Sequence, residues 1–408
     1  MMNVLHMIDS FDQGGTERQA IQLVGLLQAS GRCQVRIACL QNKGMLRADA
    51  DRLNLGEIPE YPLTSFYDLN FIRQVRSLMR FLKENRIDVV HTHCFYTNIF
   101  GMIAARLARV PVRVTYKGET HGFRTSKQKW VERAAFRFAH RIVANSDAVR
   151  RQLIKEGVPP AKVSVHYNGL DFERVRIDSG LHREDAREFL GLPPNRRYVT
   201  IVANLRHPVK DHPMFLRAAA RVRQAVPDAG FVIAGEGELM PGLRELADQL
   251  GLAKDVFFIG RCERVAELLF ASDVCVLSSR AEGFSNSILE YMAAARPVVV
   301  TDVGGAREAV VEGETGYIVP AGNEEMMSAR IIDLLRDPRA ASTMGERGKR
   351  RVEETFSCSR HVANTLDLYS EILGPRIPGG EAEEPATLDL AQVPSHPEQL
   401  SVAGKSNR

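Results

Sequence analysis

The sequence predicts an α/β protein made of two doubly wound, parallel-sheet domains. Short runs of β-branched and other apolar residues alternate with amphipathic segments, which is the pattern of repeated βα units. The same plan is followed in each half of the chain. The length of 408 residues also fits two domains, because one domain takes roughly 100 to 200 residues.

The candidate strands are short and apolar. In the first half they cover residues 4–8, 34–40, 88–91, 112–116, 141–144 and 163–166. In the second half they cover residues 198–203, 230–234, 256–260, 274–277, 297–301 and 317–319. Between them lie segments such as residues 68–85, where apolar residues recur at helical spacing. Each half therefore predicts one sheet with helices on both faces.

The domain boundaries follow from composition. Residues 168–185 are charged and contain few apolar residues, so we expect the hinge there. We predict an N-terminal domain over 1–185, a C-terminal domain over 186–357, a last helix over 358–373 and a disordered tail over 374–408. Ligands of facing doubly wound sheets bind in the cleft at the carboxyl ends of their strands.

Composition excludes several classes of protein. The net charge of +4 is too small to indicate a nucleic-acid partner, and the sequence shows neither a signal peptide nor a long apolar run. Six scattered cysteines without a CxxC pair indicate reduced thiols and a cytoplasmic chain. Basic residues outnumber acids over 124–155; this region is either a solvated helix face or a patch for an anionic membrane surface or acceptor.

Two strand exits carry motifs that suit a phosphate ligand. Gly14-Gly15 follows the first strand and permits close backbone approach, with Thr16 and Gln19 matching a capping box at a helix start. A tight turn without function explains this pair equally well. Arg206 and Lys210 follow the strand over 198–203, where they either grip a diphosphate from two sides or form a basic surface loop.

The stretch AEGFSNSILE, residues 281–290, carries two acids around a helix start. Glu282 lies in the loop before the helix and Glu290 one to two turns inside it, so the acids can address two parts of one ligand whose phosphates the backbone N–H groups hold. Alternatively, Ser287 and Glu290 form only a capping box. A paired-carboxylate glycosidase is a weaker interpretation.

Further candidates lie on the same rim. Gly304-Gly305 and Gly260-Arg261 are two more strand exits, and His121 sits in a glycine-flanked loop where it is either structural or faces the cleft. We expect no metal site, because the acids of Asp49-Ala50-Asp51 fit a solvated helix and His91-Thr92-His93-Cys94 lacks a further ligand cluster.

Together these motifs resemble the retaining nucleotide-sugar glycosyltransferases of family 4, also called glycosyl transferases group 1. The resemblance covers about residues 3–372 and is carried by Gly14-Gly15, Gly118-x-x-His121, Arg206 with Lys210, Glu282-Gly-Phe-Ser-Asn-x-x-x-Glu290 and Val303-Gly304-Gly305. It implies the GT-B architecture, with two Rossmann-like domains facing a central cleft and a last helix crossing back to the first. It also implies retention of anomeric configuration, no bound metal and no other cofactor.

The resemblance implies roles for the matching residues. Glu290 would bind the donor ribose and Glu282 the transferred sugar, while Arg206 and Lys210 would stabilise the leaving phosphate. The backbone at Gly283, Phe284, Ser285 and Asn286 would hold the diphosphate, His121 would contact the sugar, Gly14-Gly15 would line the phosphate and acceptor side, and Arg261 would lie near the base. Ser285 and Glu119 depart from the family pattern, where proline and threonine are frequent.

The expected function is that of an enzyme that moves a sugar from a UDP- or GDP-sugar to a lipid-linked or surface-polysaccharide glycan. It would work in the cytoplasm, at the inner face of the membrane, with no nucleic-acid partner. Two alternatives remain open: a nucleotide-sugar epimerase of the same fold and a non-catalytic sugar-nucleotide-binding protein. A dinucleotide-dependent dehydrogenase is disfavoured, because the chain lacks GxGxxG.

Overall fold

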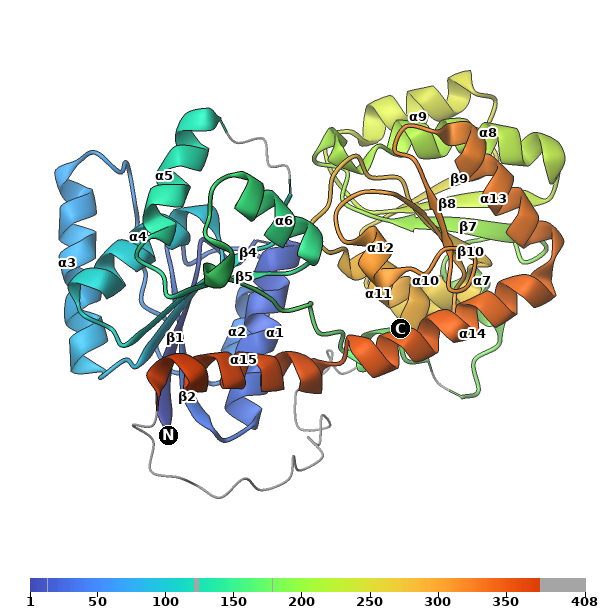
Figure 1. Cartoon of the computed structure of the whole chain (residues 1–408). Coiled ribbons are helices and arrows are strands. Elements are labelled where there is room, and N and C mark those ends of the chain that lie inside the picture. The colour runs from blue at the N-terminus through green and yellow to red at the C-terminus, as the bar shows by residue number, and fades with distance from the viewer. Residues whose placement is uncertain (13, 121–124, 178, 375–408) are drawn as a thin grey trace, which may run out of the picture.

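Two parallel six-stranded sheets form the frame of the molecule (Figure 1). The computed structural model describes residues 1–12, 14–120, 125–177 and 179–374. The first sheet has the order β2-β1-β3-β4-β5-β6 and the second the order β12-β11-β10-β7-β8-β9. The predicted α/β class with two doubly wound sheets is confirmed.

All twelve predicted strands form; β1 begins two residues earlier than predicted, and the other bounds shift by at most one residue. The first sheet consists of β1 (Met2–Ile8), β2 (Cys33–Cys39), β3 (Val89–Thr92), β4 (Val112–Lys117), β5 (Arg141–Ala144) and β6 (Val163–Val165). The second consists of β7 (Arg197–Val202), β8 (Ala229–Ala234), β9 (Val256–Gly260), β10 (Val274–Leu277), β11 (Val298–Thr301) and β12 (Tyr317–Val319). Strands β3, β8, β10 and β11 are buried along their whole length, as expected when helices cover both faces.

Helices connect the strands on both faces of each sheet. In the first half they are α1 (Gly15–Ala29), α2 (Arg47–Arg52), α3 (Leu69–Glu84), α4 (Phe95–Leu107), α5 (Ser126–Phe136) and α6 (Asp147–Lys155). In the second half they are α7 (Arg183–Phe189), α8 (His212–Ala225), α9 (Met240–Gln249), α10 (Val265–Ala271), α11 (Asn286–Ala293), α12 (Ala306–Ala309), α13 (Glu324–Arg336), α14 (Pro338–Thr355) and α15 (Cys358–Leu373). Single 3₁₀ turns are η1 (Pro160–Lys162), η2 (Phe172–Val175) and η3 (Pro208–Lys210). No described helix combines the length and apolarity needed to cross a bilayer.

The strand order places one crossover reversal in each sheet. Strand order reverses between β1 and β3 in the first sheet and between β7 and β10 in the second. Ligands of such sheets bind outside the carboxyl ends of the strands at these points. Gly14-Gly15 follows β1, Arg206 and Lys210 follow β7, and Glu282 follows β10. The fold therefore brings the predicted site residues to both reversal points.

The connection between the sheets is better packed than its composition suggests. Leu170 and Val175 are buried in one apolar cluster with residues of α11. Helix α7 spans the predicted boundary at residue 185 and packs on the second domain, where Arg183 Nη1 lies 2.7 Å from Asp273 Oδ1.

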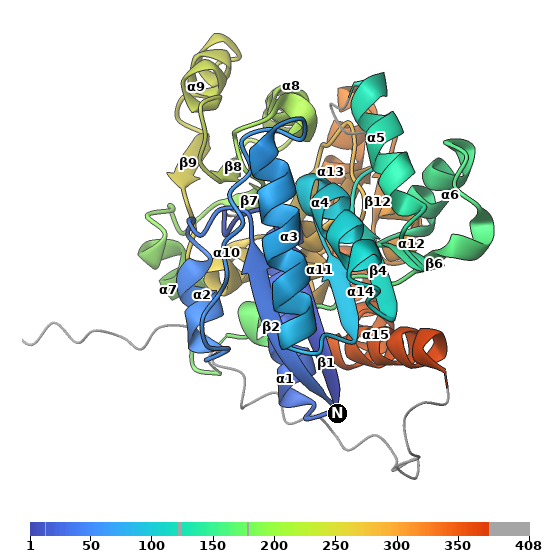
Figure 2. The ribbon, with the colours of Figure 1, turned by 90° about the vertical axis from the view of Figure 1, so that its left-hand side faces the viewer.

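Helix α15 returns from the second domain to the first. Figures 1 and 2 show it lying beside the first sheet, with α14 leading to it from the second domain. Val362, Leu366 and Tyr369 of α15 belong to the same apolar cluster as β1 and α1. The Tyr369 hydroxyl also lies 2.7 Å from His91 Nδ1 of β3. The chain thus crosses between the domains twice.

Candidate active site at the start of helix α11

The start of α11 has the open backbone that the sequence predicts. Ser285 is its N-cap residue, and no side chain caps the helix there. The Ser287 hydroxyl donates to the carbonyl of Val202 at 3.0 Å, and Glu290 pairs with Arg174. The alternative interpretation, a capping box between Ser287 and Glu290, is therefore wrong, because both side chains are held by other elements.

Glu282 lies at the centre of a charged cluster where two strand exits meet. Its Oε1 atom accepts hydrogen bonds from Lys210 Nζ and Ser279 Oγ, each at 2.6 Å. Lys210 belongs to η3 after β7, whereas Ser279 and Glu282 follow β10. The side chains of Lys210 and Glu282 are only 19% and 14% exposed, so the charge-assisted bond holds both in place.

Glu290 faces a group of arginines that sequence reasoning missed. Arg174 Nη2 lies 3.3 Å from Glu290 Oε1, and the Glu290 side chain is 10% exposed. Burial is the main cause that lowers the pKa of Arg18, and the nearby charge of Arg174 lowers it further. The negative charge of Glu290 offsets only part of this shift. The Arg18 guanidinium makes no hydrogen bond to any residue in the part of the chain that the structure describes, whereas its backbone N–H donates to the carbonyl of Gly14 at 3.2 Å. Arg18 and Arg174 both precede residue 186, where the predicted C-terminal domain begins. Only the folding of the whole chain brings them to Glu290.

Arg206 and Arg261 lie apart from the Glu282 cluster. Arg206 Nη2 is 3.6 Å from Glu236 Oε1, and its side chain is exposed. Arg261 Nη1 lies 3.5 Å from the Met45 sulfur of the first domain, and its Nη2 lies 3.7 Å from Glu263. Arg206 and Lys210 thus face different carboxylates instead of one shared point. His121 lies outside the described residues.

The first strand exit meets α11 across the domain boundary. Helix α1 begins at Gly15, with Gly14 as an N-cap that makes no side-chain bond. The expected capping box is therefore wrong: Thr16 lies inside the helix, and Gln19 Nε2 donates instead to the carbonyl of Gly169 at 3.3 Å. A Cβ atom on Gly15 would lie 3.8 Å from Asn286 Nδ2. Two helix starts therefore lie close together.

Residues of the first domain hold the loop that carries Glu282. Thr120 Oγ1 donates to the Glu282 carbonyl at 2.6 Å, and Ser146 Oγ donates to the Gly283 carbonyl at 3.2 Å. A Cβ atom on Gly283 would lie 1.9 Å from the Gly118 carbonyl oxygen, so only glycine fits this contact. Phe284 packs its ring against Tyr167 and Phe356, which fixes the other end of the loop.

Three histidines form a group with metal-ligand chemistry in the first core. Ring nitrogens of His6, His91 and His93 lie within 4.8 Å of one another. His6 Nδ1 and His93 Nε2 are 2.8 Å apart, a hydrogen-bond distance. Burial lowers the pKa of His6 to about 3, so the ring is neutral at pH 7. The sequence pattern missed His6 because it lies in β1, more than 80 residues before His91 and His93.

The other metal candidate, the acids of α2, is engaged otherwise. Asp49 and Asp51 pair with Arg52 and Arg47 of the same helix, as a solvated helix predicts.

A separate cavity of about 430 Å³ lies in the first domain. It is bordered by α5, by the loop before β6 and by η1, and its wall includes Trp130, Arg133, Arg137 and Lys162. The Trp130 side chain is 63% exposed. Part of the basic region over 124–155 thus lines a hollow that also carries the rings of Trp130 and Phe136.

Two family models match the chain, one on each domain. Residues 13–174 match the model described as Glycosyltransferase Family 4, and residues 182–351 match the model described as Glycosyl transferases group 1. Between them the two matches take in nearly every site residue described above.

Curated relatives and solved structures agree with these matches. The UDP-Gal:alpha-D-GlcNAc-diphosphoundecaprenol alpha-1,3-galactosyltransferase of Escherichia coli is 28% identical over 86% of this chain and 96% of the relative. The alpha-maltose-1-phosphate synthase of Mycolicibacterium smegmatis is 30% identical over 70% of this chain and 79% of the relative. The crystal structure of Anabaena Alr3699/HepE in complex with UDP and glucose superposes with a TM-score of 0.81 at 21% identity, over 91% of this chain and 100% of that chain.

Proposed function

The chain belongs to glycosyltransferase family 4, and on that premise we propose that it moves a sugar, with retention, from a nucleoside-diphosphate sugar to a lipid-linked or surface-polysaccharide glycan. It is a glycosyltransferase of GT-B architecture. The observation that carries the proposal is the pair of acids around the start of α11. Each of them is held by a cation from another element.

In this proposal the donor lies along the start of α11. The uncapped N–H groups hold the diphosphate, because a helix N-terminus favours negative charge. Glu290 accepts from the ribose hydroxyls and Glu282 from hydroxyls of the transferred sugar. Glu282 precedes the helix start and Glu290 lies inside the helix, which suits a ligand with hydroxyls on both sides of a diphosphate.

Charge on the leaving nucleotide is balanced by cations. Lys210 sits beside Glu282, and Arg18 and Arg174 sit beside Glu290. As the glycosidic bond breaks, negative charge grows on the outer phosphate, and preorganised cations stabilise it more in the transition state than in the ground state. We propose that these side chains and α11 serve this role without a divalent cation. The departing phosphate then takes the proton of the acceptor hydroxyl.

The donor base and acceptor are proposed by analogy with named relatives. The name of the Escherichia coli relative gives a UDP-sugar donor and a diphosphoundecaprenol-linked acceptor. The Anabaena structure contains UDP and glucose. We therefore propose a UDP-sugar before a GDP-sugar, and a glycan on a lipid diphosphate before a soluble acceptor.

A transfer assay tests the proposal. The purified enzyme is incubated with radiolabelled UDP-galactose, UDP-glucose, UDP-N-acetylglucosamine or GDP-mannose and a bacterial lipid extract, and label is counted in the organic phase. We expect label to enter the lipid fraction with one donor only. Release of free sugar and UDP at the same rate without lipid would instead favour the epimerase alternative.

We further propose that the cavity beside Trp130 faces an anionic membrane surface. Arg133, Arg137 and Lys162 line it with positive charge, and Trp130 offers an exposed ring of the kind that settles at lipid headgroups. Trp130 is the single tryptophan of the chain, so its fluorescence reports on this surface alone.

Vesicle binding tests this contact. Adding vesicles rich in phosphatidylglycerol should shift Trp130 emission to shorter wavelength, whereas phosphatidylcholine vesicles should not, and salt should weaken the response. Replacing Arg133 and Arg137 by Glu should abolish the shift, while Arg217→Glu in α8 serves as a control with one exposed arginine changed in the other domain. Equal responses to both lipids would contradict an electrostatic contact.

A further inference from the structure

Glu308 makes a contact that the proposed transfer reaction does not use. It belongs to α12 in the second domain, yet its carboxylate accepts two backbone hydrogen bonds from the first. Oε2 accepts from the N–H of Asp147 at 2.6 Å, and Oε1 accepts from the N–H of Ala148 at 2.9 Å. Both donors are in the first turn of α6.

This carboxylate completes the cap of α6. The first N–H groups of a helix have no partner within it. Ser146, the N-cap residue, accepts from the N–H of Val149 at 3.2 Å. Glu308 satisfies the two N–H groups that precede it, so every orphan donor in the first three positions has an acceptor. One of those two acceptor side chains comes from the other domain.

The start of α6 also holds the loop that carries Glu282 and Gly283, here called the donor loop. Ser146 Oγ donates to the Gly283 carbonyl, which also accepts from the N–H of Gly305 at 2.7 Å. A Cβ atom on Gly305 would lie 2.9 Å from the Ser146 Cβ, so the Ser146 side chain packs closely on the Gly305 backbone. The Gly283 carbonyl is therefore fixed by both domains, next to Glu282 and the start of α11.

Helix α12, which carries Glu308, is held in place by hydrogen bonds from α14. Arg351 of α14 donates to the carbonyls of Glu308 and Ala309 at 2.7 and 2.8 Å. The neighbouring Tyr167 is half-buried, and burial together with the Glu308 carboxylate raises its pKa to about 12. A fixed carboxylate thus meets a fixed helix dipole, the favourable pairing of a negative charge with a helix N-terminus.

We propose that Glu308 is a positioning residue that latches the two domains in the closed arrangement needed for transfer. It touches neither of the acids assigned to the donor. It acts through α6 and Ser146, which hold the Glu282–Gly283 loop against the first domain. Opening the latch moves the first domain, with Arg18, away from the donor acids, and leaves Glu282, Glu290 and Lys210 of the second domain in place.

Two pairs of variants test the latch. Glu308→Gln keeps the side-chain volume but removes the charge, and Glu312→Gln is its control, because Glu312 Oε2 accepts from the N–H of Ile318 at 2.5 Å within the second domain. Asp147→Pro removes one N–H from the first position of α6, where proline is tolerated. Asp147→Ala is its control, since it loses the same carboxylate but keeps the N–H.

Small-angle scattering, turnover and nucleotide affinity give separate readouts. We expect Glu308→Gln and Asp147→Pro to raise the radius of gyration and to lower kcat by about tenfold, equivalent to about 1.4 kcal/mol. The Kd for the nucleoside diphosphate should stay within about threefold by our estimate, because Glu282, Glu290 and Lys210 are unchanged. Both controls should retain the radius and kcat of the original chain.

The outcomes separate this inference from the proposed function on which its turnover arm rests. If the chain binds no nucleoside diphosphate, the proposed function fails, but scattering still decides whether Glu308 closes the domains. An unchanged radius of gyration in both latch variants would overturn the latch. So would equal changes in each variant and its control, which would indicate a purely structural role.

Discussion

Single side chains at the α11 start are held in pairs of opposite charge that come from separate elements. Glu282 is bonded to Lys210 of η3, and Glu290 to Arg174 of η2. Each carboxylate is mostly buried and would carry a large desolvation penalty without its cation. The pairs therefore hold both acids in place before a ligand arrives.

Arg206 gives the clearest test at this scale. Its exposed guanidinium makes one ion pair, at 3.6 Å, so it adds little to folding. The family resemblance assigns Arg206 to the leaving phosphate, which requires its exposed side chain to turn from Glu236 toward the bound donor; Arg206→Ala then lowers kcat by about 10² because that cation is lost. Steady-state kinetics and thermal unfolding measure the two effects.

Arg217→Ala is the matched control for that change. Arg217 is equally exposed, lies in the same domain and pairs with Glu324 at 3.4 Å. We expect kcat within about twofold of the original, since surface changes away from a site have small effects. Similar kcat values for the two variants would refute the assignment of Arg206.

Local motifs were the least reliable part of the sequence analysis. Thr16 and Ser287 both fit a capping box by spacing, yet neither caps its helix. Ser287 instead bonds the Val202 carbonyl, and the first helix starts a residue earlier, at Gly15. Spacing describes only the helix itself, whereas the Ser287 hydroxyl is bonded by a strand that packs against the helix, and Thr16 lies inside α1 because that helix starts earlier.

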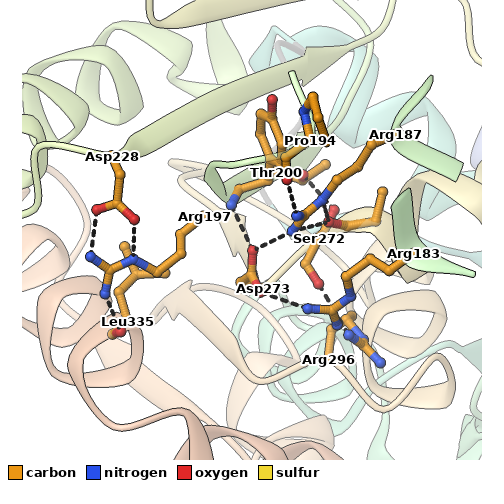
Figure 3. A network of polar contacts seen from close by, with 12 residues as sticks. Arg183, Arg187, Pro194, Arg197, Thr200, Asp228, Ser272, Asp273, Arg296 and Leu335 are labelled. Atoms are coloured by element: carbon orange, nitrogen blue, oxygen red, sulfur yellow. Dashed lines mark hydrogen bonds and ion pairs between the residues drawn. The ribbon is translucent and has the colours of Figure 1, made fainter. Parts of the chain in front are cut away.

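Among the elements, α7 is fixed by a carboxylate at the amino end of the second sheet. Figure 3 shows Asp273, just before β10, at the centre of this network. It lies 2.7 Å from Arg183 and 3.2 Å from Arg187, and accepts from the N–H of Tyr198 at 2.7 Å. The cluster lies at the end of the sheet opposite the active-site loops, so its role is stability.

We predict that Asp273→Asn lowers the free energy of unfolding by about 2 kcal/mol, because the partly buried guanidinium of Arg187 loses its counter-charge. Asp228→Asn, at the more exposed pair with Arg197 in Figure 3, should cost less than about 1 kcal/mol. Denaturant titration measures both. Equal losses would show that burial does not set the strength of these pairs.

Helix α15 is attached through buried histidines, which makes its docking sensitive to pH. His91 contacts Tyr369, and His361 Nδ1 accepts from the N–H of Gly169 at 2.9 Å. Burial lowers the pKa of His361 to about 4 and that of His6 to about 3. As the pH falls, these rings take up protons near their ordinary pKa of about 6.5 in the unfolded chain. In the folded chain they take up protons only at a lower pH.

Stability should consequently fall as pH drops from 6.5 toward 4. Each such histidine contributes about 1.4 kcal/mol for every pH unit in this window, by linkage. Denaturant titrations at pH 7.5, 6.0 and 5.0 measure the slope, and His361→Gln should flatten it. A free energy of unfolding that is constant or rises on acidification would contradict the assignment of neutral buried rings.

At the level of the whole molecule, the sequence predicted the frame but not the contacts across it. The strands were predictable because each is a short apolar run that both-sided burial requires, as in β10 and β11. The placement of Glu282 and Lys210 near one another was also predictable, because both follow strands of one parallel sheet, whose carboxyl ends lie at the same edge. Contacts such as Glu308 with α6, or Arg18 near Glu290, join residues more than 150 positions apart and leave no local pattern.

The two domains therefore have distinct parts in the account. The second supplies Glu282, Glu290 and Lys210, and the first supplies Arg18 and the hydroxyls of Thr120 and Ser146 that hold the donor loop. Transfer depends on both, whereas nucleotide binding depends chiefly on the second. This division predicts that domain closure affects kcat more than nucleotide affinity.

Calorimetric titration with UDP, GDP, ADP and NAD, each with EDTA and with magnesium, tests the central claim most directly. We predict that one nucleoside diphosphate binds in EDTA, and that Glu290→Gln weakens it at least about tenfold, because a ribose acceptor is lost. Thermal unfolding should confirm that this variant is folded. Failure of every diphosphate to bind, a preference for NAD, or full affinity in Glu290→Gln would contradict a donor site at the start of α11.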